Sequence, residues 1–275
     1  MTVDANGKKQ HTVEILHVMD CATCILIAAR PREDYDAYRT LLEMVEVIRK
    51  WGLPRSITFD RDPRFVGSYT GRDFPAAFVR FWHTLGVEPK ICPPQRPDLN
   101  CYVERYHRSY KYECLNVHRP SDIGEVREVT EHYQHHYNYE RPHQGRSCNN
   151  QPPRVAFPNL PALRGIPLLV DPDRWVNEID GNRYVRRVNA NGSVSVDKHR
   201  YYVGKSLAGQ YVSVQVNAAS RELSFSRNLE VIKRVPIKGL HGCEVSFDEY
   251  VELIANEARS EQRRRNQNAL QVKAA

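Results

Sequence analysis

A proline-rich stretch divides this sequence into two parts with different hydrophobic periodicity, and that division limits the possible folds more than any other feature. Proline fixes φ and lacks an amide donor, so residues 149–172 are predicted to form a semi-rigid linker. The prolines of this stretch are Pro152, Pro153, Pro158, Pro161, Pro167 and Pro172. The chain of 275 residues is long enough for a domain on each side of the linker.

The part before the linker alternates predicted strands and helices. Strands are expected at 12–19, 24–29, 56–59 and 87–92, and helices at 34–51, 74–85, 99–117 and from 121 onward. A hairpin followed by alternating helices and strands predicts an α/β fold, with a mixed sheet that helices cover on both faces. Active groups of such sheets gather at the carboxyl ends of strands. Asp60 directly follows one predicted strand, and Glu104 lies in the first turn of the helix after the next strand.

The predicted helix at 99–117 carries charged residues beside an apolar stripe. The stripe consists of Leu99, Val103, Tyr106, Tyr110, Cys114 and Val117. Glu104 lies at its edge, and Arg108 and Lys111 follow at positions i+4 and i+7. Such a carboxylate can bind a metal ion, while the cationic side chains further along the helix contact phosphates. The alternative is a solvated helix face, in which a charge pair contributes a few tenths of a kcal/mol.

The part after the linker changes to short alternating runs that predict strands. These strands are expected at 183–188, 193–197, 200–203, 211–216, 222–225 and 231–235. So many short strands in a small stretch predict a small β-barrel over 173–240. Residues 241–275 are expected to hold a helix at 250–265 and a basic tail. The run Arg263–Arg265 is either solvated or in contact with phosphates.

Composition favours a polyanionic partner and gives no sign of a membrane. The net charge of +7 is in the direction expected for a protein that binds nucleic acid. No apolar run approaches 18 residues, so we expect no membrane span, and the N-terminus has no secretion signal. Seven cysteines without framework spacing fit reduced thiols in a cytoplasm.

Two further patterns are weaker metal candidates. Cys21 and Cys24 form a single CxxC, which without a second pair is poor evidence for zinc. His132 and His136 are one helical turn apart and could ligate a metal ion, but the sequence has no HExxH. We expect these histidines to lie on a solvated helix face.

Four segments before residue 157 give a family resemblance. They are ILHVMDCATC at 15–24, GLPRSITFDRDPRF at 52–65, RPDLNCYVERYHRSYK at 96–111 and YNYERPHQ at 137–144. In this order, the segments resemble the integrase-core transposases, which are DDE recombinases of insertion sequences related to retroviral integrases. The resemblance implies a ribonuclease H-like fold for residues 1–148, which would form the integrase catalytic core. It also implies that the small barrel after the linker binds DNA or partner subunits.

The resemblance implies a metal-dependent reaction on DNA. In this family three carboxylates hold two Mg²⁺ or Mn²⁺ ions, which serve phosphoryl transfer into DNA. Asp60 matches the second carboxylate and Glu104 the third. Arg105, Arg108 and Lys111 fall at or beside positions that lie against DNA phosphates. The expected function is DNA strand transfer during transposition, by a homo-oligomer on transposon ends and target DNA. The expected location is the bacterial cytoplasm, at the nucleoid.

The sequence departs from the family pattern at the first carboxylate. In the family, the strand that carries the first carboxylate precedes the hairpin, and that strand is missing here. Asp20 aligns with a turn position of the family that holds no metal. Asp4 lies too far along the chain to reach the metal centre. We therefore expect an incomplete first strand, with the first catalytic Asp upstream of residue 1. Asp62 and Cys101 replace glycines of the family pattern, and Asp62 could compete with Asp60 for metal. The alternative function is a truncated transposase that binds DNA or a full-length partner and catalyses nothing.

Overall fold

The computed structural model describes residues 13–67, 74–94, 100–145 and 147–274 of the chain. It divides into two compact units. Unit 1 comprises Met1–Pro54, Thr58–Arg61 and Lys90–Gly165, and unit 2 comprises Arg55–Ile57, Asp62–Pro89 and Ile166–Ala275. The domain boundaries at 148, 172 and 240 stay predictions. Within the described residues, no helix is long and apolar enough to cross a membrane.

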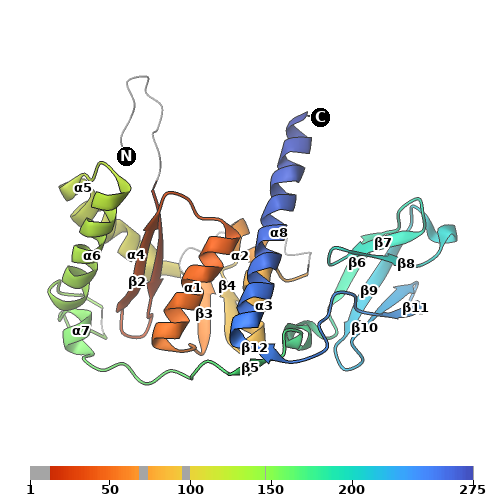
Figure 1. Ribbon diagram of the computed structural model, residues 1–275, viewed down its shortest axis with the longest axis horizontal. Coiled ribbons are helices and arrows are strands. Elements are labelled where there is room, and N and C mark those ends of the chain that lie inside the picture. Colours follow the sequence, from red (N-terminus) through yellow and green to blue (C-terminus); the bar gives the residue numbers. More distant parts are fainter. Residues whose placement is uncertain (1–12, 68–73, 95–99, 146, 275) are drawn as a thin grey trace. The chain divides into compact units, whose positions relative to one another are not determined.

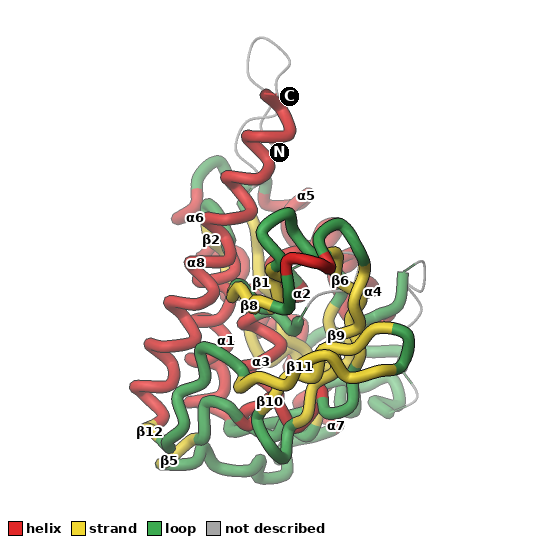
Figure 2. The backbone as a smooth tube through the Cα atoms, turned by 90° about the vertical axis from the view of Figure 1, so that its right-hand side faces the viewer, coloured by secondary structure: helices red, strands yellow, loops and turns green. Residues whose placement is uncertain are grey.

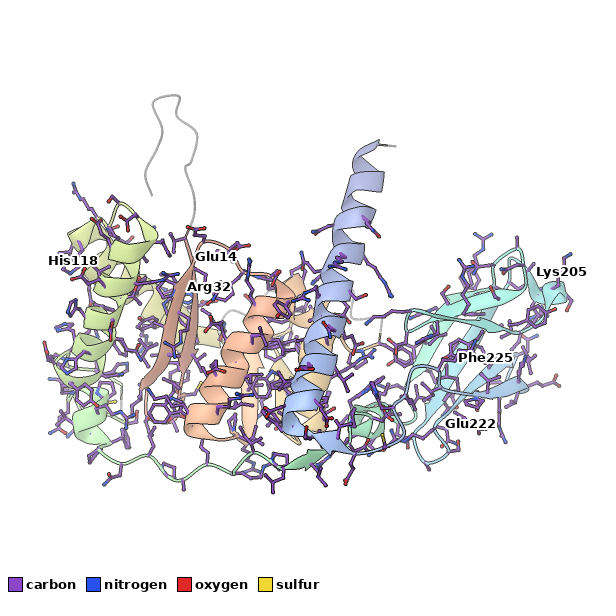
Figure 3. All side chains as sticks on the ribbon, viewed as in Figure 1. Glu14, Arg32, His118, Lys205, Glu222 and Phe225 are labelled. Carbon is purple, nitrogen blue, oxygen red and sulfur yellow. The ribbon has the colours of Figure 1, made fainter. Side chains whose placement is uncertain are left out.

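The first described elements of unit 1 form the predicted hairpin. Strands β1 (Glu14–Met19) and β2 (Leu26–Arg32) pair antiparallel, so that their outer ends, Glu14 and Arg32, are partners (Figure 3). Asp20 closes the turn, because its carboxylate accepts hydrogen bonds from the backbone N–H (3.1 Å) and the hydroxyl of Thr23. Asp20 therefore lies in the turn that joins the two strands of the hairpin.

The next elements follow the predicted order closely. Helix α1 (Ala37–Trp51) starts at Asp36, whose side chain accepts a hydrogen bond from the Arg39 N–H at 2.7 Å. It ends at Gly52, where φ is +89°, a conformation that favours glycine. Strands β3 (Ser56–Phe59) and β4 (Glu88–Ile91) are neighbours.

The two strand pairs differ in direction. The hydrogen bonds from Glu88 N to Arg55 O (3.1 Å) and from Cys92 N to Phe59 O (2.9 Å) advance together along both chains, as in a parallel pair. An antiparallel hairpin and a parallel pair among helices make a mixed α/β arrangement, as expected. Across the described residues, the two pairs are separate two-stranded sheets rather than one continuous sheet.

The predicted helix at 99–117 is present but changes its winding. It consists of α4 (Cys101–Ser109), a π-helical segment (Tyr110–Leu115) and α5 (Asn116–His118), and α6 (Ile123–Tyr139) follows. The buried side chains of these helices pack with β2 into one aromatic cluster. Its buried members are Leu26, Ala29, Tyr106, Tyr110, Cys114, Tyr133 and Tyr137.

An amide clamp fixes α6 along β2 (Figure 1). The Asn138 side chain accepts a hydrogen bond from Leu26 N and donates one to Leu26 O, both at 2.9 Å. These two bonds satisfy the N–H and C=O of Leu26, because among the described strands β2 pairs only with β1. A short helix, α7 (Pro153–Ala156), ends the part of unit 1 after α6.

In unit 2, helices α2 (Pro63–Val66) and α3 (Ala77–Thr84) accompany the C-terminal half of the chain. Arg80 of α3 is 5% exposed and is neutralised by Asp197 and by Glu257, the latter at 2.9 Å. A buried guanidinium needs such partners, because an unpaired buried charge is strongly unfavourable.

All six strands predicted after the linker are present, but they do not close into a barrel. They are β6 (Arg183–Arg187), β7 (Ser193–Val196), β8 (His199–Tyr202), β9 (Tyr211–Asn217), β10 (Glu222–Arg227) and β11 (Glu230–Pro236). Strands β11, β10, β9 and β6 form an open sheet in this order (Figure 2), while β7 and β8 pair only with each other among the described residues.

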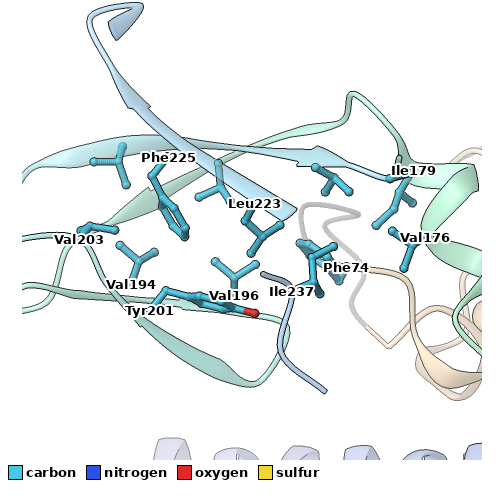
Figure 4. Packing of buried hydrophobic residues seen from close by; sticks show 14 of the residues in the cluster. Phe74, Val176, Ile179, Val194, Val196, Tyr201, Val203, Leu223, Phe225 and Ile237 are labelled. Atoms are coloured by element: carbon cyan, nitrogen blue, oxygen red, sulfur yellow. The ribbon is translucent and has the colours of Figure 1, made fainter. Parts of the chain in front are cut away.

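A shared core explains how an open sheet and a hairpin replace the expected barrel. Val194 and Tyr201 of the hairpin pack with Leu223 and Phe225 of the sheet (Figure 4). Alternation along each strand predicts which face is buried, whereas closure depends on which strands pair at the edges. Two short 3₁₀ helices, Arg174–Ile179 and Lys205–Leu207, connect these elements.

The C-terminal helix is longer than predicted. Helix α8 spans Phe247–Ala274, and a small pair of strands, β5 (Leu169–Val170) and β12 (Val245–Ser246), precedes it. Ser246 and Glu249 form a capping box: Glu249 accepts from Ser246 N at 2.9 Å, and Ser246 Oγ accepts from Glu249 N at 3.3 Å. Arg265 donates to the carbonyl of Pro63, so the predicted basic tail is part of a helix that packs within unit 2.

Candidate active site

Asp60 lies directly after β3, at the carboxyl end of the strand, and its side chain is exposed. The backbone around it is fixed on both sides. Cys92 N donates to Phe59 O at 2.9 Å, and Arg61 Nε donates to Cys92 O at 3.2 Å. The predicted position of Asp60 at a strand end is confirmed.

Glu104 lies in the first turn of α4, also with an exposed side chain. The opposite face of the helix is anchored by Tyr106 and Tyr110, which are 1% and 3% exposed. Anchoring of this face directs Glu104 outward, as the apolar stripe in the sequence predicts.

His107 lies within the electrostatic influence of both carboxylates. Packing around its ring lowers the pKa of His107, and the nearby negative charges of Glu104 and Asp60 act in the opposite direction. Both carboxylates are therefore close enough to act on one imidazole, within the same unit. The sequence analysis named Asp60 and Glu104 but did not single out His107.

His17 of β1 is a second histidine that the sequence analysis missed. Its ring centroid lies 4.8 Å from that of Tyr106, 4.9 Å from that of His107 and 5.2 Å from that of Tyr110. Burial and the neighbouring His107 lower the pKa of His17 to about 3. Both ring nitrogens are shielded from solvent and have no hydrogen-bond partner among the described residues. A polar residue inside an apolar strand was the only sequence signal.

A shallow groove of about 330 Å³ follows the exposed side of α4. It is lined by Cys101, Glu104, Arg105, Arg108, Ser109, Tyr112 and Glu113. Two of the three predicted phosphate contacts, Arg105 and Arg108, thus share one groove with Glu104. Lys111 is exposed but is not part of the lining. It lies in the π-helical segment, where the wider turn changes the direction of side chains relative to α4.

Arg141 fixes the far end of this groove. Its guanidinium contacts both carboxylate oxygens of Glu113, at 2.5 and 2.7 Å, and Tyr133 donates to the same carboxylate at 2.8 Å. The bonds from Arg141 lower the pKa of Glu113 below its usual 4.5. Arg141 therefore fixes the segment after α6 to the helix that carries Glu113.

Removal of this contact gives a testable stability effect. Arg141→Ala is expected to lower the free energy of unfolding by about 1–2 kcal/mol at pH 7, because it leaves Glu113 without its charged partner at a partly exposed site. The loss should shrink below pH 4.5. The folded-state pKa of Glu113 is depressed, so the pair contributes above the unfolded value and fades as the pH falls. Urea denaturation at pH 7 and pH 3.5 measures this, and a loss that does not depend on pH would contradict it.

Two other acidic residues that the sequence analysis considered have structural roles. Asp20 holds the hairpin turn. Asp62 caps α2 and is bound by Arg64 at 2.8 Å. Burial alone would raise the pKa of Asp62, but the hydrogen bonds from Arg64 lower it overall. Asp4 lies outside the described residues. Among those that are described, no cluster of three metal-ligating side chains includes Asp60 or Glu104.

Comparisons with known proteins agree with the sequence motifs. Residues 85–153 match the family model of the integrase core domain. A 39.2 kDa protein of insertion element IS476 from Xanthomonas euvesicatoria is 33% identical over 102 residues, which is 37% of this chain and 27% of the relative. A 31.7 kDa protein of insertion element IS407 from Burkholderia multivorans is 29% identical over 92 residues, 33% of either chain. Over these segments the chain is similar to integrase-core proteins of insertion elements.

The matches of this chain to its curated relatives span a third of their length or less. Solved structures with similarity include the HTLV-2 integrase catalytic core with magnesium, at 12% identity and a TM-score of 0.36 over 52% of this chain and 92% of that chain. The simian T-cell lymphotropic virus intasome has 11% identity and a TM-score of 0.40, over 82% and 75% of the two chains.

The donor atoms around His107 suit a hard divalent ion. Exposed carboxylates are the ligands that Mg²⁺ and Mn²⁺ take from proteins, and Mg²⁺ keeps several waters, so a few protein ligands are enough. Asp60 and Glu104 of this chain provide such oxygens near His107, both from exposed side chains.

Proposed function

We propose that this chain contributes a ribonuclease H-like catalytic core to metal-dependent DNA strand transfer in transposition. The observation that supports it best is the approach of Asp60 and Glu104 to the same histidine, His107. These two residues come from segments that are far apart in the sequence but match the integrase-core pattern. We further propose that the protein acts as a homo-oligomer on transposon ends and target DNA, at the bacterial nucleoid.

Each residue of the groove has a role in this proposal. Asp60 and Glu104 would hold Mg²⁺ or Mn²⁺, two ions in the full site. When bound, such ions activate the attacking hydroxyl and stabilise the leaving oxygen. Arg105 and Arg108 would contact DNA phosphates beside Glu104, and Lys111 would contact the backbone further along the helix.

Strand transfer with a labelled duplex tests the proposal. The protein should join labelled DNA ends to a second duplex only with Mg²⁺ or Mn²⁺, and Glu104→Gln or Asp60→Asn should reduce joining at least about 100-fold, because each variant removes a charged ligand. Glu128→Gln, an exposed glutamate of α6, is the matched control and should leave the rate unchanged. Joining that survives both Asp60→Asn and Glu104→Gln would contradict the metal assignment.

A second candidate function is DNA binding without catalysis. It is favoured by the observation that no third carboxylate joins Asp60 and Glu104 in the described parts of the chain. This function predicts that the chain binds DNA equally well with Mn²⁺ and with a chelator, and joins no ends under either condition. Metal-dependent joining would exclude it.

The groove arginines should determine the salt dependence of DNA binding. Arg108→Ala is expected to weaken binding to all sequences alike, and to reduce the slope of log K against log salt by about 1. Fluorescence anisotropy at several salt concentrations measures this. Arg127→Ala, an exposed arginine of α6 outside the groove, serves as control. Equal slopes for Arg108→Ala and wild type would place the DNA elsewhere.

A further inference from the structure

Three buried side chains with metal-ligating atoms meet at a place that the proposed function does not use. One ligating atom each from Cys24, His143 and Cys148 lies within 4.8 Å of the others. The exposed fractions of these residues are 2%, 7% and 0%. All three belong to unit 1. Cys24 comes from the β1–β2 hairpin, whereas His143 and Cys148 follow α6.

Side-chain contacts join the two segments. Cys148 Sγ donates to the carbonyl of Thr23 at 3.5 Å. Ser147 Oγ lies 3.9 Å from the sulfurs of both Cys24 and Cys148. The three ligating residues are thus part of one fixed arrangement. The Ser147 oxygen, a candidate fourth ligand atom, lies beside the two sulfurs.

Gly145 leaves the space between the imidazole and a sulfur open. A Cβ atom at Gly145 would lie 2.8 Å from Nδ1 of His143 and 3.8 Å from Sγ of Cys24. The Gly145 N–H donates to the same Nδ1 at 3.1 Å. Any larger residue at position 145 would therefore push against the His143 ring on the side that also faces Cys24.

Cys24 has an unusual backbone conformation. Its φ of +61° is left-handed, which costs a residue other than glycine about 1–2 kcal/mol. This conformation occurs where the hairpin turn leads into the buried start of β2. Strain at such a position is often retained where a side chain must be held in place for a purpose.

We propose that Cys24, His143 and Cys148 form a zinc site, with Ser147 or a water molecule in the fourth position. Two thiolates and an imidazole are a donor set that Zn²⁺ prefers, and Mg²⁺ and Mn²⁺ do not. On binding, the two thiols lose their protons to solvent, and the sulfurs and the unprotonated nitrogen of His143 donate electron pairs to the ion, with no change in oxidation state. His143 Nδ1, which accepts the hydrogen bond from Gly145 N in the metal-free chain, would exchange that bond for the ion.

The ion would connect the hairpin to the segment after α6. Because a metal bound only by the folded chain stabilises it, zinc should raise the melting temperature. The cluster is not the CxxC of the sequence, which by itself was poor evidence for zinc. Cys21 is exposed and lies outside the cluster, and Cys24 is instead brought to Cys148, which is far away in the sequence.

Cobalt and zinc titrations test the site without any need for activity or DNA. The chain is prepared with a reductant and free of metal, and then receives Co²⁺. One equivalent should give the thiolate charge-transfer and tetrahedral absorption bands, and Zn²⁺ should displace it. Cys148→Ser and Cys24→Ser should each weaken binding more than about 100-fold, beyond the loss typical of second-shell changes. Cys21→Ser and Cys114→Ser are the matched controls and should bind as wild type does.

A second measurement guards against variants that fail to fold. In the wild-type chain, Zn²⁺ should protect two thiols from alkylation and leave the exposed Cys21, Cys101 and Cys243 reactive. Absence of Co²⁺ bands in the folded wild type would overturn the proposal. So would binding that persists in Cys148→Ser, or the loss of two thiols to a disulfide whether or not zinc is present.

Discussion

Tyr106→Ala is expected to lower the free energy of unfolding by about 3–5 kcal/mol, the range for removal of a large buried aromatic side chain. Tyr106 is 1% exposed, and its ring centroid lies 4.8 Å from that of His17 and 4.9 Å from that of Tyr137, both edge-on. It joins β1, α4 and α6 within unit 1. Its loss should therefore also release the helix that carries Glu104.

Two variants make this prediction specific. Tyr102→Ala, on the exposed side of the same helix, should cost less than about 0.5 kcal/mol. Tyr106→Phe should be neutral or stabilising, because the Tyr106 hydroxyl is buried without a hydrogen-bond partner among the described residues. Urea denaturation measures all three. Equal losses for Tyr102→Ala and Tyr106→Ala would show that the aromatic cluster does not anchor α4.

His17 should make stability depend on pH. Its pKa falls from 6.5 to about 3 on folding, so below pH 6.5 the unfolded chain binds a proton that the folded chain does not. The contribution of His17 to the free energy of unfolding is largest above pH 6.5 and decreases as the pH falls towards 3. The free energy of unfolding at pH 5 should therefore be about 2 kcal/mol lower than at pH 7 on account of this group.

His17→Phe isolates this effect from that of other histidines. The variant keeps an aromatic ring against Tyr106 and Tyr110 but cannot titrate. The difference between the stabilities at pH 7 and pH 5 should therefore be about 2 kcal/mol smaller than in wild type. Other groups, His107 included, remain in both proteins and cancel. An unchanged difference would mean that His17 is accessible to protons in the folded state.

Local signals in the sequence predicted the elements that position the site. The strand at 56–59 brings Asp60 to its end, and the apolar stripe of 99–117 orients Glu104, because both depend on nearest neighbours and helical period. The capping box of Ser246 and Glu249 is a local signal for the start of α8. The prediction used the apolar periodicity alone and therefore put the start of this helix at residue 250 instead of Phe247.

Features that depend on distant contacts could not be predicted. The π-helical turn at Tyr110–Leu115 moves Lys111 out of the groove, and no local sequence pattern predicts this turn. The expected barrel depended on edge pairing, which alternation does not determine. Cys24 and Cys148 are neighbours because α6 packs along β2, so the spacing of cysteines in the sequence could not reveal their cluster.

Calorimetric titration with Mn²⁺ tests the central claim, that Asp60 and Glu104 hold a divalent ion, most directly. The wild-type chain should bind Mn²⁺, and both Glu104→Gln and Asp60→Asn should lose that binding while Glu128→Gln keeps it. Circular dichroism of each variant confirms that the helices remain. No binding by the folded wild type, or equal binding by Glu104→Gln and wild type, would contradict the assignment of these carboxylates.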